Sequence, residues 1–119
     1  MKKIITISIA TVLNLVAFTQ TDIENARIQG VGATVGITGI VINGDELGPI
    51  RYIQDTTAGI ALYDPAILGG IIRGDEISVT GILVDYNGLL EMNPVNAVVT
   101  NSSANPSPIP LVVTPNQIG

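Results

Sequence analysis

Two segments of this chain share one unusual pattern, a glycine inside a run of β-branched and aliphatic residues. Residues 37–42 (ITGIVI) match residues 79–84 (VTGILV) position by position. A glycine weakens the interior of a strand, so it usually marks a bulge or a sharp bend there. Two long strands bent at Gly39 and Gly81 are what a small closed barrel requires. Two copies are too few for a solenoid of stacked repeats.

From residue 34 onward, short segments rich in Val, Ile, Thr and Tyr alternate with strong turn signals. This pattern is typical of β-strands. We expect five strands, at about residues 34–43, 49–55, 59–64, 76–86 and 89–100. The sequence therefore predicts an all-β fold, a five-stranded barrel.

Turn chemistry and side-chain alternation add detail to this prediction. Asn87-Gly88 is the strongest hairpin signal in the sequence, and residues 55–59 (DTTAG) suit a tight hairpin with Gly59 in the left-handed conformation. Residues 65–72 (PAILGGII) predict one apolar helical turn.

The alternation of apolar residues predicts a buried core. Its expected members are Val35, Ile37, Val41, Ile53, Ile60, Leu62, Ile77, Val79 and Leu83.

The N-terminal segment has a different character. Residues 1–19 place two lysines before an apolar stretch that is too short for a bilayer span of roughly 20 residues. They fit a secretory signal peptide cut before Gln20, with a buried N-terminal strand or helix as the alternative. Residues 22–29 then predict one short helix, with Thr21 as its N-cap and Glu24 completing a weak capping box.

The C-terminal segment resembles a linker. Residues 101–110 contain three prolines and three serines, and residues 111–113 form a short apolar run that could add to an edge of the barrel. Thr114-Pro115 is a helix-start signal with little chain behind it. We expect a signal peptide over 1–19, a barrel over 20–100 and a Pro/Ser-rich linker and tail over 101–119. A longer exported protein and a frayed tail are both compatible with this end.

Composition excludes several functions. The chain has no Cys and no His, so it lacks a thiolate nucleophile, the commonest acid–base catalyst and the commonest metal ligand. Without residues 1–19, three arginines (Arg27, Arg51 and Arg73) face ten acids, a net charge of −7. Most of the acids lie at turns, where Asp is favoured for conformational reasons. We expect no enzymatic activity, no catalytic residue, no cofactor and no metal site.

The order of strands and turns resembles that of a known fold. The segments GITGIVI, IRYIQDTTAGIALYD and RGDEISVTGILVDYNGLLEM resemble the OB-fold domains of secreted bacterial, Bacteroidetes-like multidomain proteins. These domains are similar to the nucleic-acid-binding modules that accompany extracellular nucleases. The resemblance covers roughly residues 22–100 and implies a Greek-key OB-fold barrel that serves as an accessory binding module.

OB-folds bind ligands on the outer face of their second and third strands. If Ile53, Ile60 and Leu62 point inward, alternation sends Tyr52, Gln54, Ala61 and Tyr63 outward. The candidate ligand-binding residues are Arg51, Tyr52, Gln54, Tyr63 and Tyr86. The tyrosines would stack on a base or a sugar ring, and Arg51 would meet a phosphate. Two tyrosines that merely cover the barrel are the alternative.

Two functions stay open at this point. The first is a secreted or cell-surface, non-enzymatic binding module for single-stranded nucleic acid or an oligosaccharide, without a membrane span in the mature chain. The second is a structural spacer or protein-interaction domain that works with other domains of a larger exported protein. The charge of −7 favours the second and opposes nucleic acid, because phosphate contacts dominate nucleic-acid affinity.

Overall fold

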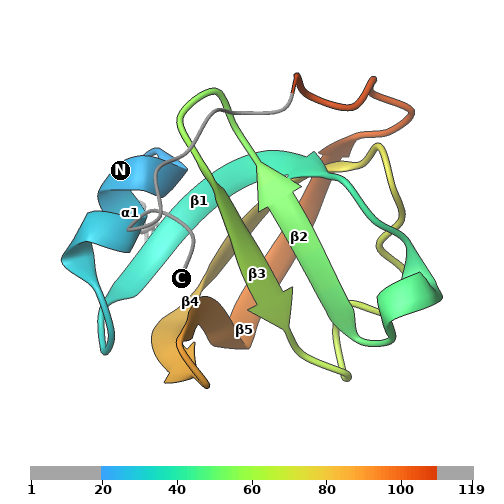
Figure 1. Ribbon diagram of the computed structural model, residues 1–119. Helices are drawn as coiled ribbons and strands as arrows, with labels where there is room; N and C mark the ends of the chain where they lie inside the picture. Colours follow the sequence, from blue (N-terminus) through green and yellow to red (C-terminus); the bar gives the residue numbers. More distant parts are fainter. Residues whose placement is uncertain (1–19, 110–119) are drawn as a thin grey trace, which may run out of the picture.

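The chain forms a five-stranded barrel with one short helix (Figure 1). The computed structural model describes residues 20–109, so the expected signal peptide, the apolar run at 111–113 and the Thr114-Pro115 signal lie outside the described residues. The elements are α1 (Ile23–Gln29), β1 (Thr34–Val41), the 3-10 turn η2 (Asp45–Leu47), β2 (Ile50–Gln54), β3 (Gly59–Tyr63), β4 (Glu76–Tyr86) and β5 (Leu89–Ser102). Each strand begins and ends within two residues of its predicted bounds.

The strands close in the order β1-β2-β3-β5-β4, with β4 returning to β1. All neighbouring strands are antiparallel except β3 and β5, which run parallel. This order, with a long fourth strand shared between β1 and β5, is that of an OB-fold barrel. The prediction of an all-β, OB-like barrel is confirmed.

The two glycine-containing strands bend in different ways. The register of β4 against β5 shifts on both sides of Gly81, so the predicted bulge is present there. Along β1 the register against β4 continues without a shift across Gly39. Gly39 instead lies close to the backbone of Gln54, the residue opposite Ile40 in the β1–β2 ladder, since a Cβ at position 39 would be 3.0 Å from the Gln54 carbonyl oxygen. Of the two alternatives predicted for Gly39, a bulge or a sharp bend, the bulge is absent against β4, and close packing on the Gln54 backbone accounts for the glycine.

The barrel interior contains every residue predicted for the core, each at most 3% exposed. Alternation predicts these positions because successive strand residues face opposite sides. Six further residues complete the core: Ile23 and Ala26 of α1, Leu68 and Ile71 of the β3–β4 connection, and Met92 and Val95 of β5. The Leu68 N–H donates to the Asp64 carbonyl at 3.2 Å, which closes a single helical turn in the predicted segment, and no longer helix follows.

The N-terminus of α1 differs from the prediction in the identity of its N-cap residue. Asp22, not Thr21, is the N-cap, and its carboxylate accepts a hydrogen bond from the Asn25 N–H at 2.8 Å. Asp is as good an N-cap as Thr, and it satisfies one of the free N–H groups of the first turn. The Glu24 N–H donates instead to the hydroxyl of Thr57 in the β2–β3 turn.

Asp55 organises the β2–β3 turn. Its Oδ1 accepts hydrogen bonds from the Thr57 N–H, the Thr57 hydroxyl and the Ala58 N–H, and its Oδ2 accepts one from the Ile23 N–H at 2.8 Å. Burial by itself would raise the pKa of Asp55, but these hydrogen bonds outweigh it and hold the pKa below its ordinary value. Gly59 does not adopt the expected positive φ, because the Asp55 carboxylate closes this turn. Asn87-Gly88 does form the expected turn, with φ of 53° and 89°.

Candidate functional site

The outer surface of β2 and β3 carries two tyrosines as diagonal neighbours. Tyr52 lies opposite Ala61, and Tyr63 lies opposite Ile50 in the same antiparallel ladder. Diagonal side chains in such a ladder are within reach of one another when they are aromatic. Both tyrosines are half-buried, as is Gln54 on the same side of β2. We call Tyr52, Ala61, Tyr63 and their neighbour Glu91 the tyrosine face.

Glu91 is a member of this face that the sequence reasoning did not single out. The parallel pairing of β3 with β5 places Glu91 opposite Ala61, so Tyr52, Ala61 and Glu91 form one row across three strands. Counting outward from the Asn87-Gly88 turn, alternation would have placed Glu91 on the outer face. Glu91 is only 3% exposed, and this burial raises the pKa of its carboxyl despite a hydrogen bond from Asn93.

Ala61 also differs from the expectation for an outward-facing residue. It is 1% exposed, although it faces the outer side of β3. The short Ala61 side chain lies between those of Tyr52 and Glu91 on the neighbouring strands. Longer side chains on both sides cover a small one, and this explains why three consecutive residues of β3 are buried.

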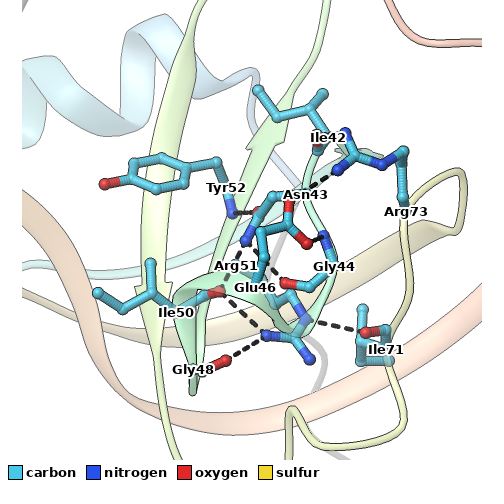
Figure 2. A network of polar contacts seen from close by, with 10 residues as sticks. All are labelled: Ile42, Asn43, Gly44, Glu46, Gly48, Ile50, Arg51, Tyr52, Ile71 and Arg73. Carbon is cyan, nitrogen blue, oxygen red and sulfur yellow. Dashed lines mark hydrogen bonds and ion pairs between the residues drawn. The ribbon is translucent and has the colours of Figure 1, made fainter.

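Arg51 does not belong to the tyrosine face, which corrects the prediction that it meets a phosphate. Arg51 lies two residues before buried Ile53, so its side chain is on the same inward side of β2, and Arg51 is 2% exposed. The guanidinium Nε donates to the Ile71 carbonyl at 2.8 Å, and Nη1 donates to the carbonyls of Gly48 and Ile50 at 2.7 and 3.0 Å (Figure 2). The bond to Ile71 is buried and those to Gly48 and Ile50 are partly buried, so the guanidinium is held by backbone carbonyls on both sides of the β2 start. Figure 2 shows the Tyr52 ring pointing away from this network.

The loop between β1 and β2 is fixed by a second set of contacts in Figure 2. The Asn43 side chain, 6% exposed, accepts from the Tyr52 N–H at 2.7 Å and donates to the Ile50 carbonyl. Arg73 forms an ion pair with Glu46 at 2.7 Å and donates to the Ile42 carbonyl. The position of Tyr52 on the outer face is thereby tied to a rigid loop.

The other two candidates are Tyr86 and Gln54. Tyr86 is 61% exposed at the end of β4, and β4 is not a neighbour of β2 in the closed barrel. Tyr86 pairs with Leu89 of β5, beyond the part of β4 that pairs with β1, so it does not join Tyr52. The Gln54 side chain donates to the Ile109 carbonyl at 2.9 Å, at the end of β2 remote from Tyr63. The structure thus brings together Tyr52 and Tyr63 and separates Tyr86 and Arg51 from them.

Among residues 20–109, no group of three or more acidic side chains is arranged to hold a metal ion. No helix within the same range is long and apolar enough to cross a membrane.

Comparisons with known proteins agree with the fold and go no further. No protein-family model matches the sequence, and no curated protein matches it. Among solved structures, the chain is similar to the hypothetical protein ygiW from E. coli, with a TM-score of 0.55 and 14% identity. The match covers 71% of this chain and 89% of that chain. At this identity, the likeness shows an OB-like barrel alone.

Proposed function

We propose that this protein is an exported, non-enzymatic OB-fold binding module whose tyrosine face takes an uncharged oligosaccharide. The observation that carries this proposal is the engagement of every cation in the range 20–109. Arg51 is buried among carbonyls, Arg73 is paired with Glu46, and Arg27 donates to the Gly59 carbonyl. Without a cation on the tyrosine face, a phosphate chain loses the term that dominates nucleic-acid affinity.

The chemistry of the tyrosine face suits a sugar better than a phosphate. Two half-exposed tyrosines offer apolar ring faces and hydroxyls that donate and accept hydrogen bonds. Glu91 lies in the same row but is 3% exposed, so the ligand-accessible part of this surface is the two tyrosine rings and it carries no cation for a phosphate. The diagonal pairing of Tyr52 with Tyr63 gives a surface of two adjacent rings.

Binding is testable by tyrosine fluorescence, because the chain has three tyrosines and no tryptophan. The probes are cellohexaose, maltohexaose and chitohexaose. An oligodeoxythymidine, titrated separately at about 50 mM salt, is the charged ligand for comparison. We expect at least one hexasaccharide to bind and the oligodeoxythymidine not to bind. Tyr52→Ala and Tyr63→Ala should each weaken binding about tenfold, which corresponds to ~1.4 kcal/mol. Tyr86→Ala is the matched control and should leave binding unchanged.

The alternative of a protein-interaction or spacer domain has its own outcome in this experiment. If neither the sugars nor the oligonucleotide bind, the net charge of −7 over residues 20–119 and the exposed apolar side chains favour a protein partner. If the oligonucleotide binds and the sugars do not, the module is a nucleic-acid binder and the oligosaccharide proposal is wrong.

A further inference from the structure

A groove of about 550 Å³ lies on the outer side of the barrel, away from Tyr52 and Tyr63. Its floor is Ile40 of β1, which pairs with Glu76 of β4 on one side and with Gln54 of β2 on the other. Its wall is the segment that follows β5, with Pro106, Pro108 and Ile109 facing the groove. In Figure 1 this segment is the red end of the chain.

The walls of the groove are fixed by hydrogen bonds. The Gln54 side chain donates to the Ile109 carbonyl at 2.9 Å and ties the wall to β2. At the base of the wall, the Asn105 N–H and its side-chain amide both donate to the Gly74 carbonyl at 2.9 Å. The floor is equally constrained, because Ile40 is paired in the barrel ladder with Gln54 on one side and Glu76 on the other. The groove is therefore preformed, as ligand sites usually are.

The groove lining combines apolar walls with one available carboxylate. Asp55 also lines the groove, but both of its oxygens accept hydrogen bonds from the β2–β3 turn and α1. The Thr38 hydroxyl is shared between Gln20 and Ser78. Within residues 20–109, the Glu76 carboxylate accepts no hydrogen bond, and none of the residues that line the groove is basic.

We propose that this groove binds a small organic cation, an apolar body that ends in a protonated amine. The amine would lie against the Glu76 carboxylate and the apolar body would pack on Ile40 and the two prolines. The volume falls within the range of roughly 300–1,000 Å³ that is typical of small-molecule sites. A carboxylate beside apolar walls attracts a cation more strongly than one in open water, because the local dielectric constant is lower. The negative net charge of the protein adds to the preference of the groove for cations and disfavours the binding of anions.

The test uses three probes of one size and different charge: n-hexylammonium, n-hexanol and hexanoate. Each is titrated into the full chain while the backbone amide signals of Gly39, Gln54 and Thr56 are followed by two-dimensional NMR. We expect hexylammonium to shift these signals saturably, hexanol to bind more weakly and hexanoate not to bind. Added salt should weaken the binding of the ammonium and leave that of the alcohol unchanged.

Two variants separate a built site from general attraction to an acidic surface. Glu76→Gln keeps the shape and removes the charge, and it should weaken hexylammonium binding about tenfold with little change for hexanol. Glu24→Gln removes the same charge from the exposed side of α1 and should change neither. Equal weakening by both variants would overturn the proposal, as would the absence of shifts at Ile40 and its neighbours. Nuclear Overhauser contacts from residues 111–113 to Ile40 in the free protein would assign the groove to the chain's own tail instead.

Discussion

Gly81 packs so closely against Pro94 that a Cβ at position 81 would overlap the Pro94 carbonyl oxygen. The same Cβ would lie 2.5 Å from the Cγ of Met92, a fully buried side chain. Gly81 does not have a positive φ, so crowding at the β4–β5 bulge, not backbone conformation, excludes a side chain here. At Gly39 the corresponding crowding is milder, since the nearest atom of Gln54 would be 3.0 Å away.

This difference predicts an order of stability for three variants. Gly81→Ala should lower the free energy of unfolding by about 3 kcal/mol and Gly39→Ala by about 1 kcal/mol, within the range for overpacking. Gly69→Ala, where the added Cβ meets nothing within 4 Å, should leave stability nearly unchanged. Urea unfolding followed by circular dichroism measures all three. If Gly81→Ala is as stable as Gly69→Ala, the account of the bulge is wrong.

Arg51 and Arg73 provide a matched pair of arginines. Arg51→Met leaves the buried Ile71 carbonyl without a donor and removes the bond to the Gly48 carbonyl, and should lower the free energy of unfolding by about 2–3 kcal/mol. Arg73→Met removes an ion pair whose side chains are about half exposed, and should lower it by less than about 1 kcal/mol. Equal losses in urea unfolding would contradict the structural role assigned to Arg51.

These two arginines also show what the sequence does and does not predict. The strands and the core follow from alternation and turn signals, which are local, so every predicted core residue is buried. The same alternation places the Arg51 side chain on the inward side of β2, together with that of Ile53. The carbonyl partners of Arg51, however, come from loops up to 20 residues away and are assembled only by the fold. Tyr52 and Tyr63 were predictable from alternation, but the burial of Glu91 depends on the parallel β3–β5 pairing.

Asp55 should make the stability of the protein sensitive to acid. Its pKa is lowered in the folded state, so its contribution is present above the ordinary value of 3.8 and is lost as pH falls through the folded pKa. Asp55→Asn removes the acceptor for the Ile23 N–H and should cost about 1–3 kcal/mol at pH 7. The difference between parent and variant should shrink below pH 3.8. A difference that stays constant down to the lowest pH would contradict a charged acceptor.

Glu91 should affect the pH dependence of stability in the opposite direction to Asp55. Its pKa is raised in the folded state, so its contribution to stability is fully present below the ordinary value of 4.5 and is lost as pH rises through the folded pKa. Glu91→Gln keeps the shape without the buried charge, and should be more stable than the parent at pH 7. The two proteins should converge near pH 4. Thermal unfolding at both pH values checks this, and a less stable Gln variant at pH 7 would show that the charged form is stabilised by the fold.

The most direct test of the tyrosine face is to map by NMR where a sugar binds on the full chain. The ligand is the hexasaccharide that binds most tightly among cellohexaose, maltohexaose and chitohexaose. The account predicts that amide shifts concentrate on Tyr52, Ala61, Tyr63 and Glu91, with little dependence on salt because no ion pair forms. Shifts centred on Tyr86 or on the opposite side of the barrel would contradict it, as would the absence of any shift with all three sugars.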